Sequence, residues 1–153
     1  MAAITRWVEY STAEAGVAGT GGGTQKGTGT QGYSLATGAS DTDAFSIGSG
    51  NDRLHVSLDG DSAYITLVSG TSLDPRLIAR DISEKLHNLG KNDPSYDQAR
   101  CVWENNQFKI YSGSLGSSSS VAVVSGTNTA HLTLGWGTKT ETGGSNNNPA
   151  TGT

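Results

Sequence analysis

The sequence predicts an α+β fold dominated by β-structure, with one mainly antiparallel sheet of five to six strands and a single amphipathic helix. Short segments of β-branched and aromatic residues recur between residues 43 and 136, and only one segment has helical spacing. Apolar residues make up 33% of the 153-residue chain, and 59 residues are Gly, Ser or Thr. That apolar content is well below the roughly 45–50% of a compact domain, so we expect only part of the chain to pack. We predict an N-terminal strand and arm (1–42), a β-β-α-β-β-β module (43–136) and a flexible C-terminal tail (137–153).

The N-terminal region is predicted to contain one short strand and a glycine-rich arm. Residues 4–10 are mostly β-branched and aromatic, which is typical of a strand. Residues 16–38 contain nine glycines and little that could be buried. They are interpreted either as a flexible linker or as an extended arm laid across adjacent subunits, anchored there by Tyr33 and Leu35.

The first hairpin of the module is predicted from alternation and a turn. A short strand is expected at 44–47. Residues 53–58 then alternate, with apolar residues on one face and polar residues on the other. Asp59-Gly60 is a strong hairpin signal, and we expect the return strand at 63–68.

One helix is predicted over residues 75–89. Asp74 is a good N-cap, and Pro75 suits the first helical position. Apolar residues repeat every four positions and form one stripe, and Gly90 follows as a stop signal.

A second hairpin and a final strand complete the predicted module. Residues 99–104 and 107–111 are expected to pair across an Asn105-Asn106 turn. Residues 121–124 are uniformly apolar, which predicts a strand buried on both faces. Residues 130–136 are expected to close the ordered part.

Composition argues against several classes of partner and site. The net charge is −4 and the ten Lys and Arg residues are scattered, so we expect no nucleic-acid binding. No apolar run approaches the roughly 20 residues that a membrane span needs. The single Cys101 and three distant histidines lack metal-ligand spacing, so no metal and no cofactor are expected.

The remaining chemistry-bearing residues fit structural roles better than catalytic ones. An acidic group could suggest calcium, namely Asp41, Asp43, Asp52, Asp59 and Asp61. The 59–62 stretch lacks the rest of an EF-hand loop, and hairpin-turn residues are the better interpretation of Asp59 and Asp61. No nucleophile elbow or phosphate-binding loop lies between a strand and a helix. Cys101 lies in a predicted strand and is interpreted as a core residue. We therefore expect no catalytic residues and no enzyme.

The order of elements resembles two groups of structural proteins. Hydrophobic–polar alternation runs into residues 65–70 and the capped helix follows. A hairpin ends at 108–113, a strand follows at 121–124, and the stretch closes at Leu134-Gly135. This order is similar to the small βαβ inserts of flagellar hook-associated proteins and to modules of tail and other virion structural proteins of tailed bacteriophages. The terminal helices of flagellar filament proteins are missing, which favours the phage proteins. The resemblance implies a repeated structural subunit with no catalytic residues.

Two functions remain open at this point. The first is a virion subunit, such as a head decoration, neck or tail component, whose partners are copies of itself and other virion proteins. It would assemble through arm exchange and strand addition, with interface residues Trp7, Tyr10, Tyr33, Leu35 and Trp136. The second is an exported bacterial surface or appendage protein with a glycan-binding β module, in which Tyr64 and Asp61 would contact the sugar.

Overall fold

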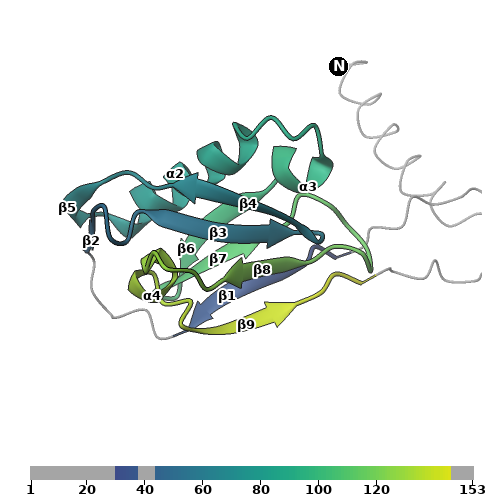
Figure 1. The fold of residues 1–153 in the computed structure, drawn as a ribbon. Helices are drawn as coiled ribbons and strands as arrows, with labels where there is room; N and C mark the ends of the chain where they lie inside the picture. Colours follow the sequence, from purple (N-terminus) through teal and green to yellow (C-terminus); the bar gives the residue numbers. More distant parts are fainter. Residues whose placement is uncertain (1–29, 38–43, 146–153) are drawn as a thin grey trace, which may run out of the picture.

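The computed structural model describes residues 30–37 and 44–145 of the chain, and these form a strand-rich module (Figure 1). Its helices are α2 (Pro75–His87), α3 (Pro94–Asp97) and α4 (Ala130–Thr133). Its strands are β1 (Tyr33–Thr37), β2 (Phe45–Ile47), β3 (Arg53–Leu58), β4 (Asp61–Thr66), β5 (Gly70–Leu73), β6 (Arg100–Glu104), β7 (Gln107–Tyr111), β8 (Val121–Val124) and β9 (Thr138–Thr142).

The predicted fold class is confirmed, but the strands are divided among sheets. The described residues form a four-stranded sheet in the order β6-β7-β1-β9, a three-stranded sheet in the order β4-β3-β8, and a two-stranded pair of β2 and β5. Every pairing is antiparallel. The single sheet expected from the sequence is therefore wrong, because β3 pairs with β4 and β8 and does not join the sheet that contains β7.

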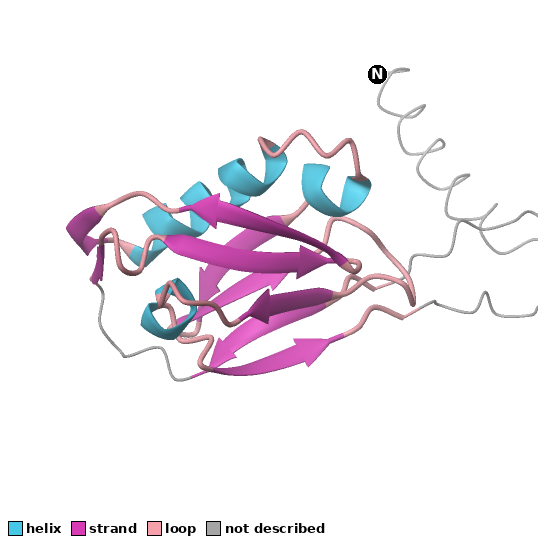
Figure 2. Ribbon diagram, in the orientation of Figure 1, coloured by secondary structure: helices cyan, strands magenta, loops and turns pink. Residues whose placement is uncertain are grey.

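One hydrophobic core lies between the two larger sheets and α2. It receives the apolar sides of β3, β7 and α2, which include Leu54, Leu58, Phe108, Ile110 and Ile82, all fully buried. Figure 2 shows α2 running along one side of the strands. At about 25 cal/mol per Å² of buried apolar surface, these side chains supply the main driving force for folding.

The helix α2 forms for the reasons that its sequence suggests. The Asp74 side chain accepts a 2.7 Å hydrogen bond from the Arg76 backbone N–H, and Pro75 follows at the first helical position. Gly90 has a φ of 62°, a left-handed conformation that glycine adopts without strain just after the helix. Helix, cap and stop are confirmed, although the helix ends at His87 rather than at residue 89.

Both predicted hairpin turns are present. Asp59 and Gly60 have φ values of 53° and 89°, and Asn105 and Asn106 have values of 51° and 59°. Two consecutive left-handed residues are the pattern of a type I′ turn, whose twist matches that of paired strands. Asp59 therefore acts as a turn residue, as expected.

The boundaries predicted for the arm and the tail are corrected by β1 and β9. Residues 33–37 fall in the predicted arm and residues 138–142 in the predicted tail, yet they form strands that pair with each other over five residues. A Cβ on Gly32 would lie 2.4 Å from the Ser119 carbonyl oxygen, so this glycine permits a close approach of two backbones. In these two segments, glycine and threonine content does not indicate flexibility.

Two further expectations at the C-terminal end also change. In β8, Val121 and Val123 are buried while Ala122 and Val124 are only half-buried, so one face of the strand and not both packs on the core. Residues 130–133 form the short helix α4. The predicted strand 4–10 and most of the predicted arm lie outside the described residues.

Candidate functional site

Of the predicted interface residues, Trp136 turns out to belong to the core. Its side chain is 2% exposed, and its ring stacks on Phe108 at a centroid distance of 5.8 Å. Gly135, with a φ of 89°, turns the chain inward at this point. Since the strand β9 follows Trp136 in the chain and belongs to the fold, Trp136 does not mark the beginning of a tail. Trp7 and Tyr10 lie outside the described residues.

Tyr33 and Leu35 lie on the outer face of the four-stranded sheet and are half-buried. Their cross-strand partners on β7 are Tyr111 and Lys109. The Lys109 ammonium lies 3.9 Å from the centre of the Tyr33 ring, and a hydrogen bond with Tyr111 raises the pKa of Lys109. Tyr33 and Leu35 therefore contribute to the outer face of the sheet. Their role as interface residues stays a prediction.

The edge of the four-stranded sheet at β6 is occupied by a side chain of α2. The Ser83 hydroxyl accepts a 2.8 Å hydrogen bond from the Cys101 backbone N–H and lies 3.3 Å from the Cys101 carbonyl oxygen. The outward backbone groups of Cys101 are therefore satisfied, which makes this part of the edge a poor template for another strand.

The outer edge of β4 is covered in the same way by lysines. Lys85 donates to the Thr66 carbonyl, and Lys91 donates to the Ser62 carbonyl at 3.1 Å. Lys91 also forms a 2.6 Å ion pair with Asp61, which holds it against this edge.

The outer edge of β8 is covered by two charged side chains of β9. The Val123 N–H donates to the Glu141 carboxylate at 3.2 Å, and Lys139 donates to the Val123 carbonyl. Lys139 and Glu141 form a 2.7 Å ion pair with each other. Because they pair with the buried Ala36 and Ser34 on β1, both side chains start from the inner face of their sheet.

The free edge of β9 is the one edge of the two larger sheets that no capping side chain reaches within the described residues. All five of its residues are exposed, and its other side pairs with β1. Three are threonines, which favour strand conformation. An antiparallel ladder leaves alternate N–H and C=O groups of such a strand directed outward, so β9 presents a template for a further strand.

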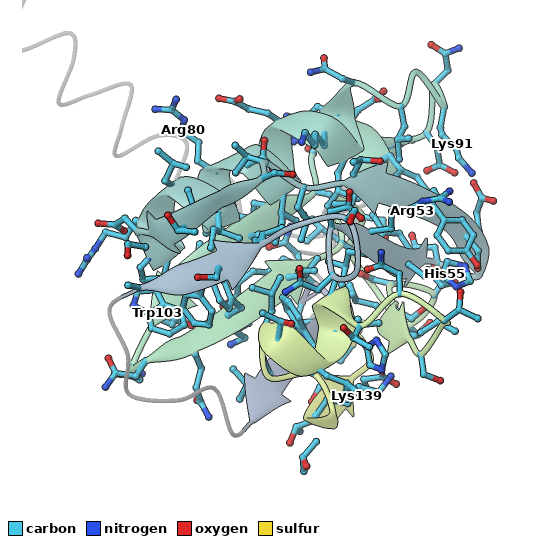
Figure 3. All side chains as sticks on the ribbon, turned by 60° about the vertical axis from the view of Figure 1, so that its left-hand side comes forward. Arg53, His55, Arg80, Lys91, Trp103 and Lys139 are labelled. Atoms are coloured by element: carbon cyan, nitrogen blue, oxygen red, sulfur yellow. The ribbon has the colours of Figure 1, made fainter. Side chains whose placement is uncertain are left out.

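A separate polar hollow of about 310 Å³ lies on the outer face of the three-stranded sheet. It is lined by side chains of β3 and β4, the end of β8 and the loop that follows, namely Arg53, His55, Tyr64, Val124, Gly126, Thr127 and Asn128. Figure 3 shows Arg53 and His55 next to each other at this surface. The His55 and Tyr64 rings stack at 4.1 Å, with their planes 13° apart.

The predicted pair of Tyr64 and Asp61 is not brought together. Tyr64 lines the hollow, whereas Asp61 pairs with Lys91 and does not line it. Residues three apart on a strand point to opposite faces, which is the physical reason for the error. Arg53, His55 and Asn128 were not singled out, although the alternation of β3 already placed Arg53 and His55 on its polar face.

Asn128 holds the loop of the hollow in place. Its side-chain oxygen accepts a 3.0 Å hydrogen bond from the Arg53 backbone N–H, and its amide nitrogen donates to Asp52 at 2.9 Å. The Thr129 N–H donates to the Gly50 carbonyl at 3.1 Å. The loop is therefore ordered against β3 before any ligand arrives.

The Cys101 thiol, a further group that could be reactive, is buried in the core. Burial raises the pKa of the Cys101 thiol, so it is held protonated in the core. No cluster of three or more His, Cys, Asp or Glu side chains that could hold a metal occurs within residues 30–37 and 44–145. None of the helices in that part of the chain combines the length and apolar character needed to span a bilayer.

A scan against protein-family models and a search of curated proteins found no match to this chain.

Proposed function

We propose that this protein is a non-catalytic structural subunit of a bacteriophage virion, which assembles with its own copies and other virion proteins by strand addition. The observation that carries the proposal is the difference between the sheet edges. Side chains reach outward backbone groups on the edges of β4, β6 and β8, while no side chain of residues 30–37 and 44–145 is seen to reach the outer edge of β9. Proteins usually protect their edges unless an edge is used for pairing.

The donor strand in this proposal is the segment 4–10 of a neighbouring copy. Its β-branched and aromatic residues suit a strand, and its connection to the module is residues 11–29. The module begins beside β9, because the Thr30 N–H donates to the Ser145 carbonyl at 2.8 Å. Fully extended, the connection could span about 65 Å, which is enough to reach a neighbouring subunit.

The expected strength of one added strand is modest. Each backbone hydrogen bond contributes about 0.5–1.5 kcal/mol, whereas ordering each residue costs about 1–2 kcal/mol. One arm in isolation therefore binds weakly unless Trp7 and Tyr10 also find pockets on the neighbour. In a closed assembly every subunit both donates and accepts a strand, and the contacts reinforce one another.

The test is concentration-dependent hydrogen exchange of the full chain, combined with sedimentation. We expect the amides of residues 138–142 to become protected as large species form. The variant Val8→Asp places a charge in the donor strand and should abolish both effects. The matched control Val17→Asp changes the same residue type in the connection and should preserve both.

Two results would overturn the proposal. If the chain stays monomeric while residues 138–142 are protected at every concentration, the donor strand pairs within its own chain and arm exchange is wrong. If assembly forms while those amides still exchange freely, another surface mediates it.

A further inference from the structure

The polar hollow on the three-stranded sheet is independent of the proposed assembly edge. None of the residues that line it belongs to β9. Its volume of about 310 Å³ is at the lower end of the range for small-molecule sites. A Cβ on Gly126 would meet no atom within 4 Å, so the loop side of the hollow is open to a ligand.

Arg53 is distinguished from most of the cations in the described residues by its lack of an acidic partner. Two cations there, Arg53 and Arg100, form no ion pair with a carboxylate, whereas six others do: Arg76, Arg80, Lys85, Lys91, Lys109 and Lys139. The guanidinium carbon of Arg53 lies 5.3 Å from the centre of the Tyr64 ring. A guanidinium free of carboxylates at the rim of a hollow is well suited to bind one bidentately.

The aromatic pair beside it supplies a different kind of contact. Tyr64 is 55% exposed, and its stacking on His55 holds the ring in one orientation. A fixed, exposed aromatic ring offers an apolar surface together with a hydroxyl group. Thr127 adds a hydroxyl on the loop side of the hollow, whereas the Asn128 amide is already used by hydrogen bonds within the protein.

We infer that this hollow binds a sugar unit that carries a carboxylate, such as a uronic acid within a surface glycan. The ring of such a sugar has apolar C–H faces to lie against Tyr64 and hydroxyl groups that can pair with Thr127. Its carboxylate pairs with Arg53. Because the loop is already held by Asn128 hydrogen bonds to β3, little ordering is needed on binding.

The charges around the hollow favour a carboxylate over a phosphate. Arg53 is the only Lys or Arg among the lining residues. The Asp52 carboxylate accepts a hydrogen bond from Asn128 and therefore lies close by. A doubly charged phosphate would have a single cationic partner and a carboxylate nearby, whereas a monoanionic sugar needs only one guanidinium.

The test uses the full chain and two sugars that differ only in the acid, methyl glucuronide and methyl glucoside. Saturation-transfer NMR and titration should show saturable binding of the glucuronide and much weaker binding of the glucoside. Arg53→Gln and Tyr64→Ala should each weaken glucuronide binding by about tenfold or more. The control Arg100→Gln removes the other guanidinium without an ion pair, which lies 4.4 Å from the Tyr111 ring, and should leave binding unchanged.

Circular dichroism of each variant confirms that the fold is intact, which is expected because Arg53 and Tyr64 are exposed. The inference is overturned if glucuronide and glucoside bind equally, or if Arg100→Gln weakens binding as much as Arg53→Gln. It is also overturned if inorganic phosphate displaces the glucuronide at equal concentration, or if no saturable binding occurs. Val8 is not among the residues that line the hollow, so glucuronide binding by Val8→Asp is expected to persist and separates this inference from the proposed assembly.

Discussion

Gly113 lies where the end of β7 meets the short helix α3, and the backbone there has no room for a side chain. A Cβ at this position would lie 2.0 Å from the Pro94 carbonyl oxygen and 2.7 Å from the carbonyl carbon of Gln98. Gly113→Ala should therefore lower the free energy of unfolding by about 2 kcal/mol or more, as overpacking of a rigid site does. Urea denaturation measures this change. Gly48→Ala is the matched control, because nothing lies within 4 Å of its Cβ, and an equal loss in both variants would contradict the steric explanation.

Tyr96 should make the protein less stable at alkaline pH. Burial, reinforced by the nearby Asp61 carboxylate, raises the pKa of Tyr96 from 10.0 to about 12. The unfolded chain then loses this proton near pH 10 while the folded chain keeps it, so the free energy of unfolding falls as pH rises from 10 towards 12. The comparison is Tyr96→Phe, measured in a Cys101→Ala background because burial also raises the pKa of Cys101. If Tyr96→Phe loses stability as steeply as its parent over this interval, the assignment to Tyr96 is wrong.

Among the elements, β6 depends on α2 for the satisfaction of its outer edge. The buried Cys101 N–H has the Ser83 hydroxyl as its partner at 2.8 Å. Ser83→Ala leaves this donor without a partner, which should cost about 1–3 kcal/mol. We expect a lower urea midpoint and faster exchange of the Cys101 amide. Ser62→Ala, at an exposed position of β4, should change neither quantity, and an unchanged amide in Ser83→Ala would show that the hydroxyl is dispensable.

The elements that were predictable from sequence are those whose partners are close along the chain. The hairpin of β3 and β4 and the helix α2 each have a turn or cap signal within a few residues. In contrast, β1 pairs with β7 and β9, which are far away in the sequence, and Gly32 beside it gives the local appearance of a linker. Long-range pairing of Gly- and Thr-rich strands has no local signal, although the alternation Thr-Lys-Thr-Glu-Thr in β9 was visible.

The candidate sites show the same limit. Tyr64 was predicted as a ligand contact because an exposed aromatic on a strand is visible in the sequence. Its partner was chosen by proximity in the chain, and Asp61 points to the other side of β4. The edge of β9 was not predictable at all, because whether an edge is covered depends on side chains such as Lys91 and Ser83 that arrive from other elements.

At the scale of the whole molecule, the module is closed by its first and last strands. β1 and β9 pair along five residues, and the Ser145 N–H donates to the Thr30 hydroxyl at 2.8 Å just beyond them. The two ends of the described module therefore lie side by side, as Figure 1 shows. β9 has two roles in consequence: its inner edge completes the fold, and its outer edge is the proposed site of assembly.

These two roles predict different outcomes for different changes to the full chain. Truncation after residue 145 should preserve both the unfolding midpoint and assembly, because β9 and its contact with Thr30 remain. Truncation after residue 137 removes β9, which pairs with β1, and also removes the Lys139 and Glu141 side chains from the edge of β8. Both the unfolding midpoint and the extent of assembly should therefore fall. Val8→Asp, which changes only the proposed donor strand, should abolish assembly and leave the midpoint within a few degrees. Thermal unfolding followed by circular dichroism and sedimentation velocity measure the two quantities on the same samples. If truncation after residue 137 leaves assembly intact, β9 is not the accepting edge, because this truncated chain no longer contains β9.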